Sequence, residues 1–456
     1  MDYNNHRKSI YKMNLLFNLT RRYVMFMFRK YYDNFIILGK ENIPVDMPVI
    51  FAPNHNNALM DALAVHYIVP RNKSLVFLAK ADLFVNKFVS SILFLSKILP
   101  AFRMRDGYGN LGRNAEVFDQ CIEILHNNQA LGIMPEGNQE IERKLRPFAK
   151  GIFRVAFEAQ KKYGISPKVK IIPVGIDFGD ILKSHKHIII NIGQPIEISD
   201  YMSLYSENPI KAINEIKGNL HNRLSKLTLD LATDKHYECF ETVVEILQGV
   251  ALEKFNLTDN TENRFHVRQK LALRLIKIEK KHINEIIQID LLSSRLTETL
   301  NQLNIKHNQL IDKESSWLEL FVGFVFLVFT FPVFVVGFIL NIIPFFSPVY
   351  IRKYILKTKY VGFFSSVHFG LSLFSFPLFY GVQTLLFGLI VNCSWWAVII
   401  FLFAQYPLGN LALSWYKGMI KLKAKFQLLQ IKKHQSKVLT DAHRIYNELV
   451  NLVFSE

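Results

Sequence analysis

Cysteine is scarce in this chain of 456 residues, which contains only Cys121, Cys239 and Cys393. The three lie far apart in dissimilar contexts, so they match neither a metal-ligand spacing nor a disulfide framework. We therefore expect no metal and no redox cofactor, and a working region that faces the reducing cytoplasm. The apolar run at 15–19 is too short and too polar for a secretory signal, and no such signal is expected.

Acidic residues are also few, because 38 Asp and Glu stand against 55 Lys and Arg, for a net charge of +17. Such an excess favours nucleic acid, anionic lipid or phosphorylated substrates as partners. No nucleic-acid-binding motif is recognisable, and the basic residues flank apolar stretches. A lipid bilayer is therefore the expected partner, and nucleic acid is not.

Charge is absent from two long stretches, 320–351 and 361–416. Because a membrane span needs about 20 apolar residues, the second stretch is predicted to hold two spans, 361–381 and 384–406, with a turn near Gly381. The loop at 352–359 between the stretches is basic, which places it on the cytoplasmic side. For 320–351 we favour a re-entrant or kinked hairpin that turns near Pro332, and one full span at 320–343 is the alternative.

The first half of the chain alternates between strand-like and helical patterns. Apolar runs rich in β-formers recur at 35–38, 49–52, 75–79, 130–134, 169–174 and 187–192, and helical patterns at 58–69, 114–126 and 151–163 separate them. This alternation predicts an α/β domain with a mostly parallel sheet covered by helices.

Two other segments have helical patterns of a different kind. Residues 10–32 alternate apolar and basic residues, which suits either an amphipathic helix on a membrane surface or a helix packed on the next domain. Residues 209–315 contain little Gly or Pro and carry charges at helical spacing, which predicts several helices with solvated charged faces.

The most informative motif is His55 with Asp61, directly after the strand-like run at 48–53. A histidine held by an aspartate is the minimal general base for a hydroxyl proton. Six positions apart, the two cannot share one helix face. We therefore predict His55 in a loop and Asp61 in the early turns of the following helix.

Three more blocks follow: Phe-Arg-Met-Arg at 102–105, Met-Pro-Glu-Gly at 134–137 and Ile-Ile-Pro-Val-Gly at 171–175. In this order and spacing, the four blocks resemble the glycerolipid acyltransferase family, which contains glycerol-3-phosphate and lysophosphatidate acyltransferases. The resemblance covers roughly residues 35 to 200. The family normally has four residues between His and Asp, and the five found here look like a branch that includes fungal-type glycerol-3-phosphate acyltransferases.

The resemblance implies roles for several residues. It makes His55 the general base and Asp61 the group that fixes the histidine tautomer. In the second block it implies a basic residue that binds the phosphate of the acceptor, with Arg103 as first choice and Arg105 as second. The fourth block resembles the segment that lines the acyl-chain side of the site.

In the third block, Glu136 and Gly137 match the family pattern and are expected on the acceptor side of the site. The family's usual Ser or Thr and Arg after the glycine are absent, because Asn138 and Gln139 stand there. A cationic cluster follows at 143–146, and Lys150 precedes a predicted helix start, a place that favours phosphate. Lys150 is the candidate for the missing cation, with an ordinary surface lysine as the alternative.

These patterns predict the following organisation: an amphipathic membrane-surface helix at 1–32, an acyltransferase domain at 33–205, a helical domain at 206–316, a membrane region at 317–416 and a basic cytoplasmic C-terminal helix at 417–456.

The function implied is a membrane-bound acyltransferase, on the cytoplasmic face of a bacterial inner membrane. It would move an acyl group from acyl carrier protein or coenzyme A to glycerol 3-phosphate or its 1-acyl derivative. No covalent acyl-enzyme is expected, since no Ser or Cys lies in a nucleophile elbow. The alternatives are another lipid acceptor such as a lysophospholipid or an amino-acid lipid, a thioesterase-like hydrolase, and a scaffold or transporter with a degenerate domain.

Overall fold

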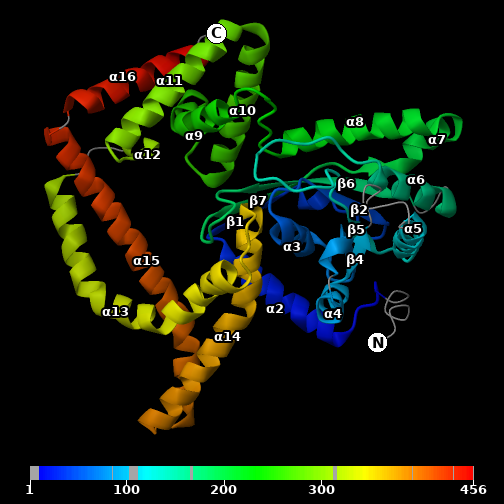
Figure 1. Ribbon diagram of the computed structural model, residues 1–456, viewed down its shortest axis with the longest axis horizontal. Helices are drawn as coiled ribbons and strands as arrows, with labels where there is room; N and C mark the ends of the chain where they lie inside the picture. Colours follow the sequence, from blue (N-terminus) through cyan, green and yellow to red (C-terminus); the bar gives the residue numbers. More distant parts are fainter. Residues whose placement is uncertain are drawn as a thin grey trace. The chain divides into compact units, whose positions relative to one another are not determined.

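The computed structural model describes residues 10–84, 86–101, 111–164, 168–311, 316–392, 394–434 and 436–454. The chain divides into two compact units, which are described separately (Figure 1). Unit 1 comprises Met1–Asp230 together with Tyr360–Ser366. Unit 2 comprises Leu231–Lys359 together with Val367–Glu456.

Unit 1 is built on one sheet. Its strands are β1 (Asn34–Leu38), β2 (Val49–Pro53), β3 (Leu75–Lys80), β4 (Ile98–Ala101), β5 (Ala130–Gly132), β6 (Lys170–Phe178), β7 (His187–Ile192) and β8 (Ile196–Glu197). The order is β1-β7-β6-β2-β5-β3-β4, and β8 pairs with β6. All pairs are parallel except β6–β7 and β6–β8. The predicted α/β fold with a mostly parallel sheet is confirmed.

Each of the six apolar runs named above coincides with a strand, but β4 and β8 were missed. β4 follows a helix after only Ser96 and Lys97, in a mostly apolar stretch where a strand and a buried helix segment look alike in sequence. Only its parallel pairing with β3, in the register Phe77 to Ile98, identifies it as a strand.

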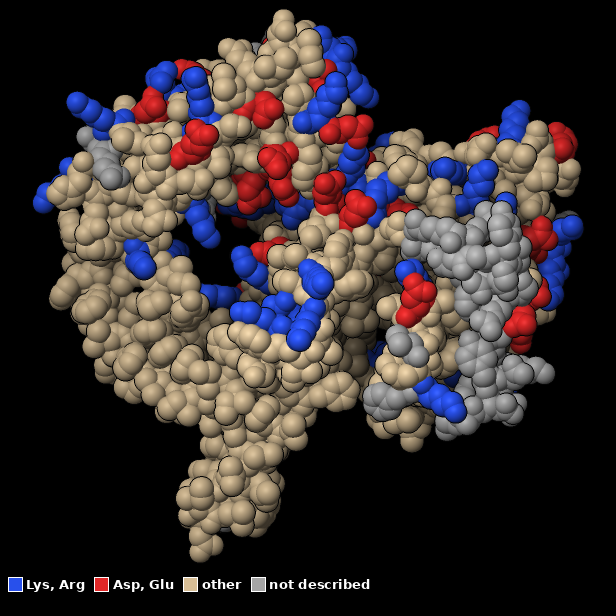
Figure 2. All heavy atoms as spheres, viewed as in Figure 1, with Lys and Arg blue, Asp and Glu red and all other residues tan. Residues whose placement is uncertain are grey.

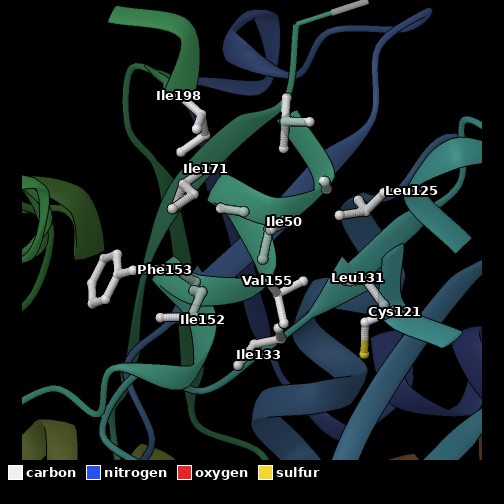
Figure 3. Packing of buried hydrophobic residues seen from close by; sticks show 14 of the residues in the cluster. Ile50, Cys121, Leu125, Leu131, Ile133, Ile152, Phe153, Val155, Ile171 and Ile198 are labelled. Atoms are coloured by element: carbon white, nitrogen blue, oxygen red, sulfur yellow. The ribbon is translucent and has the colours of Figure 1, made fainter. Parts of the chain in front are cut away.

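Helices cover this sheet. They are α2 (Leu15–Tyr31), α3 (Ala58–Ile68), α4 (Lys87–Leu95), α5 (Leu111–His126), α6 (Gly151–Tyr163), α7 (Met202–Glu207) and α8 (Pro209–Leu227), with short 3-10 turns η1 (Lys40–Asn42), η2 (Ala81–Leu83), η5 (Ile198–Tyr201) and η7 (Val361–Phe363). Figure 3 shows Ile50 of β2, Leu131 of β5 and Ile171 of β6 in one buried cluster with Phe153 and Val155 of α6. Burying such a side chain stabilises the fold by about 1.5–3 kcal/mol.

Helix α8 belongs to unit 1, because its apolar face joins this cluster. The buried residues of that face are Ala212, Ile213, Ile216, Leu220 and Leu224. Gly175 of β6 allows the end of α8 to approach closely, since a Cβ there would lie 2.2 Å from the carbonyl oxygen of Leu227. The predicted domain boundary after residue 205 therefore does not coincide with the division of the structure, which falls after Asp230.

Among the described residues of unit 2, the regular elements are all helices. Its helices are α9 (Tyr237–Lys254), α10 (Thr261–Lys281), α11 (Ile283–Gln302), α12 (His307–Ile311), α13 (Trp317–Tyr350, extended by the π-turn η6, Ile351–Ile355), α14 (Phe364–Val391, whose first three residues belong to unit 1), α15 (Trp395–His434) and α16 (Ser436–Phe454). Three of the segments, Trp317–Ile355, Val361–Val391 and Trp395–His434, are long and apolar enough to cross a membrane. In Figure 2 the apolar length of α13 has almost no charged side chains on the face in view.

The predicted turn near Pro332 is wrong, because α13 runs unbroken from Trp317 to Tyr350 with Pro332, Pro344 and Pro348 inside it. An internal proline removes one helical hydrogen bond and bends a helix, but it does not reverse the chain. In this long apolar helix, the remaining hydrogen bonds and the packing against α15 keep the chain helical on both sides of each proline.

The predicted turn near Gly381 is also wrong. Helix α14 continues to Val391, with Pro377 inside it, and α15 begins at Trp395. The basic segment after residue 417 does not start a new helix either, since α15 continues to His434 and only α16 follows separately.

Polar side chains connect the three apolar helices. The Tyr380 hydroxyl of α14 donates to Asn341 Oδ1 of α13 at 2.6 Å, and Asn341 Nδ2 donates to the Gln405 carbonyl of α15 at 3.1 Å. Gln405 Nε2 donates back to the Tyr380 carbonyl at 3.3 Å. Interhelical hydrogen bonds of this kind hold apolar helices in register where lipid offers no hydrophobic driving force.

Candidate functional site

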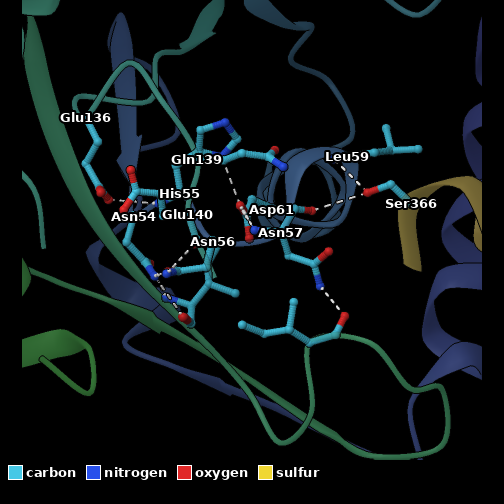
Figure 4. Close-up of polar contacts among 12 residues, drawn as sticks. Asn54, His55, Asn56, Asn57, Leu59, Asp61, Glu136, Gln139, Glu140 and Ser366 are labelled. Carbon is cyan, nitrogen blue, oxygen red and sulfur yellow. Dashed lines mark hydrogen bonds and ion pairs between the residues drawn. The ribbon is translucent and has the colours of Figure 1, made fainter. Parts of the chain in front are cut away.

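The site lies at one edge of the sheet. Strands β2 and β5 are parallel neighbours, so their carboxyl ends meet at the same edge. His55 comes two residues after the end of β2, and Glu136 comes four residues after the end of β5. Figure 4 shows Glu136 next to His55, beside the helix that carries Asp61.

His55 and Asp61 are hydrogen-bonded. Nδ1 of His55 lies 3.0 Å from Oδ2 of Asp61, a fully buried carboxylate in the first turn of α3. Because an ionised carboxylate can only accept, the pair sets the tautomer in which Nδ1 carries the hydrogen and Nε2 has a lone pair. The predicted placement, with His55 in the loop and Asp61 at the start of the helix, is confirmed.

The turn between these two residues is strained. Ala58, the first residue of α3, has a φ of 39°, in the left-handed region where a side chain costs about 1–2 kcal/mol. The Asn57 N–H donates to the same Asp61 Oδ2 at 2.7 Å. The carboxylate therefore holds the loop backbone as well as the imidazole.

The backbone of His55 is held on both sides. Its N–H donates to Glu136 Oε1 at 2.9 Å, and its carbonyl accepts from Arg146 at 2.9 Å. Arg146 also donates through Nε to Glu136 Oε2 at 2.7 Å, so the arginine and the glutamate form a buried pair around His55. This role of Arg146 is not visible in the sequence, where residues 143–146 form one cationic cluster.

Burial raises the pKa of Glu136 above its usual value, and the neighbouring Arg146 offsets part of this effect. Both carboxylate oxygens are occupied by His55 and Arg146. Glu136 therefore holds the backbone of His55, and its expected place on the acceptor side of the site stays a prediction.

The loop after β5 turns at Gly137, whose φ of 70° lies in the left-handed region that favours glycine. The Ala149 N–H donates to the Pro135 carbonyl at 2.7 Å, which ties this turn to the start of α6. Lys150 follows directly as the residue before α6 and is exposed. The structure thus brings Gly137 and the segment before α6 to the same edge as His55.

Two asparagines beside His55 also anchor its loop. Asn54 accepts from the Ile176 N–H at 2.7 Å and donates to the Ile176 carbonyl at 3.0 Å, which joins the loop to β6. Asn56 Nδ2 donates to the carbonyls of Glu140 and Glu142. Both were missed, because their partners are backbone groups distant in sequence.

Two of the predicted phosphate ligands, Arg103 and Arg105, lie outside the described residues. The fourth block lies within β6, between β2 and β7, and its side chains are buried. Burial raises the pKa of the Cys121 and Cys239 thiols to about 12, so neither is a thiolate nucleophile at neutral pH.

An α/β sheet with a His–Asp pair at the carboxyl edge defines a candidate acid–base centre. Residues 34–177 match the family model for acyltransferases.

Known proteins are similar to part of this chain. The chloroplastic 1-acyl-sn-glycerol-3-phosphate acyltransferase LPAT1 of Arabidopsis thaliana is 25% identical over 166 residues, 35% of this chain and 43% of the relative. Glycerol-3-phosphate O-acyltransferase 1 of Saccharomyces cerevisiae is 26% identical over 143 residues, 31% of this chain and 18% of the relative. The chain thus spans less than half the length of these relatives.

Among solved structures, the crystal structure of the 1-acyl-sn-glycerophosphate acyltransferase PlsC from Thermotoga maritima is similar. It is 20% identical, covers 48% of this chain and 82% of that chain, and has a TM-score of 0.33.

Proposed function

We propose that this protein is an O-acyltransferase that moves a fatty acyl group from a thioester to a hydroxyl of glycerol 3-phosphate or 1-acylglycerol 3-phosphate, in phospholipid synthesis. The observation that carries the proposal is the His55–Asp61 hydrogen bond at the carboxyl edge of the sheet. The acyltransferase family model over residues 34–177 and the names of the similar proteins support the reaction class and the acceptor.

The reaction follows from the tautomer. His55 Nε2 takes the proton of the acceptor hydroxyl as its oxygen attacks the thioester carbonyl. Asp61 accepts from Nδ1 and stabilises the imidazolium that forms. Collapse of the tetrahedral intermediate breaks the carbon–sulfur bond, and the leaving thiolate takes the proton back from Nε2. The products are an ester and a free thiol, and His55 returns to its starting form.

Glu136 and Arg146 keep this base in place through its backbone. They hold the N–H and the carbonyl of His55, so the imidazole has little freedom to leave the line of attack. Such preorganisation matters, because misplacing a catalytic group by about 1 Å can cost a hundredfold in rate.

For the acceptor phosphate, the proposed ligands are Arg103 and Arg105, with Lys150 as the third cation. The exposed position of Lys150 beside the Gly137 turn supports its role. The net charge of +17 suits a phosphorylated acceptor and either acidic donor, coenzyme A or acyl carrier protein.

We further propose that the three apolar helices cross a bilayer, the bacterial inner membrane, with the site on its cytoplasmic face. The basic loop at 352–359 supports this orientation through the positive-inside rule. Residues Tyr360–Ser366 directly follow that loop and belong to the same unit as His55, which supports a common side for both.

The test is acyl transfer by the purified protein, with thiol release and lipid product measured for glycerol 3-phosphate and 1-acylglycerol 3-phosphate separately. His55→Ala is expected to abolish transfer while the protein stays folded, and replacing the exposed His434 by alanine is expected to leave it unchanged. Transfer at the wild-type rate by His55→Ala would refute the assignment. Free fatty acid formed without an acceptor would instead identify a thioesterase.

A further inference from the structure

Helix α3, which carries Asp61, does not cap its own N-terminus. Asn57 is its N-cap residue, yet the Asn57 side chain makes no capping hydrogen bond to the helix. Asn57 Nδ2 donates to the Ile181 carbonyl at 3.1 Å instead, and Oδ1 accepts from the Ser365 hydroxyl at 2.6 Å. The residue type that best caps a helix is thus turned away from it.

Ser366 supplies the missing cap. Its Oγ accepts from the Leu59 N–H at 3.2 Å, which is the second residue of α3 and a usual target of a cap side chain. The same hydroxyl lies 3.4 Å from the Asn57 carbonyl, to which it donates. Figure 4 shows Ser366 reaching the start of the helix from a separate segment of the chain. A residue 307 positions later therefore caps the helix that carries Asp61.

Both serines come from the segment Tyr360–Ser366, which belongs to unit 1 and ends in the first turn of the apolar helix α14. Ser365 is 1% exposed and Ser366 is 7% exposed. The Tyr360 hydroxyl donates to the Gln139 carbonyl at 3.3 Å, so the same segment also contacts the loop that follows Glu136. One short segment thus touches the loops that hold both His55 and its backbone partner.

The geometry of Asp61 depends on the groups that these serines hold. Asp61 Oδ2 accepts from the Asn57 N–H and from His55, while the buried Oδ1 has no hydrogen-bond partner among the residues that the structure describes. Ala58 is strained between them, so the turn needs outside restraint to persist. A shift of Asn57 would move one of the two groups that orient the carboxylate.

We propose that Ser365 and Ser366 are positioning residues for the His55–Asp61 pair. Efficient proton transfer then requires the segment Tyr360–Ser366, which leads into the apolar helix α14, to be docked on the catalytic loop. This proposal rests on the proposed acyl transfer. Under this proposal, the catalytic site on the α/β sheet depends on a segment that is continuous with the apolar helices.

The test compares Ser366→Ala and Ser365→Ala with Ser375→Ala. Ser375 is a matched control, because it is a buried serine of the same helix whose hydroxyl donates to the Pro344 carbonyl, away from the site. Ser366→Thr keeps the hydroxyl and serves as the rescue variant. For each we would measure kcat, KM and the pH dependence of kcat/KM.

Ser366→Ala is expected to lower kcat about tenfold, with KM changed less than twofold, since loss of a cap displaces Asp61 and not the substrate ligands. Ser366→Thr should recover most of kcat, and Ser375→Ala should match the wild type.

Hydrogen–deuterium exchange at the amides of residues 57–60 provides a readout that needs no activity. Faster exchange at these amides in Ser366→Ala, with unchanged exchange in the β5 and α6 peptides, would support the proposed restraint. This result would hold even if no acceptor were turned over, and in that case only the proposed function would fail. Exchange and kinetics in Ser365→Ala and Ser366→Ala indistinguishable from those of Ser375→Ala would overturn the proposal.

Discussion

Replacing Arg146 by alanine is expected to leave the buried Glu136 carboxylate unpaired. The resulting loss of stability is expected to depend on pH. Arg146 makes its hydrogen bonds to Glu136 and to the His55 carbonyl, and the Glu136 side chain is only 1% exposed. Removing one partner of a buried ion pair costs about 3–5 kcal/mol, because the other charge stays buried and unpaired. For a unit of this size, that corresponds to a fall in melting temperature of about 10 °C.

The pH dependence follows from the sign of the shift. Burial already raises the pKa of Glu136 above its usual value, and loss of Arg146 removes the charge that opposes this rise. A carboxyl whose pKa is higher in the folded state binds more protons there, so stability falls as pH rises from the unfolded pKa through the folded one. Arg146→Ala should therefore be destabilised less at pH 5 than at pH 8.

The assay is thermal unfolding of the wild type, Arg146→Ala, and Arg146→Ala with Glu136→Gln, each at pH 5 and pH 8. The double variant carries neither charge of the Arg146–Glu136 pair, so it should regain stability at pH 8 and lose the pH dependence that Glu136 causes. Arg444→Ala removes an exposed ion pair and serves as the control, with no measurable change expected. An equal, small loss for Arg146→Ala at both pH values would refute the reasoning.

Three further predictions follow from the site and the membrane region. Asp61→Asn should lower kcat about a thousandfold or more with little change in KM, because an amide can donate to Nδ1 and select the wrong tautomer; a fall below tenfold would contradict this. Gly137→Ala should cost about 1 kcal/mol in denaturant unfolding from its φ of 70° alone, since the nearest atom to a new Cβ lies 3.9 Å away. Lys359→Cys, with Cys393 replaced by serine, should react with an impermeant maleimide only in inside-out vesicles, and labelling of intact cells would place the loop on the other side.

Much of unit 1 was predictable, because local patterns act there over short distances. Six of the strands and helices such as α6 coincide with runs whose period and flanking residues are visible in the sequence. The position of His55 in a loop and Asp61 in a helix followed from their spacing, since six positions do not fit one helix face.

The errors share a different cause. The turn near Pro332 was inferred from a proline between two segments that were both expected on the cytoplasmic side, and the turn near Gly381 from the length of the uncharged stretch. A long apolar helix, however, tolerates a proline when its neighbours pack around it. The boundary predicted after residue 205 rests on a change in composition and stays a prediction, and the apolar face of α8, which follows it, packs on the core of the sheet.

The sequence by itself determined the chemical groups of the site and their approximate order: a base, its carboxylate, a glutamate–glycine turn and an excess of cations around them. Only the tertiary structure decided which of these groups form hydrogen bonds and ion pairs with one another. Arg146 pairs with Glu136 around the His55 backbone, and Ser366 caps the helix of Asp61 from 307 residues away. Hydrogen bonds between distant segments depend on where the sheet brings the chain together, and no local pattern records that position.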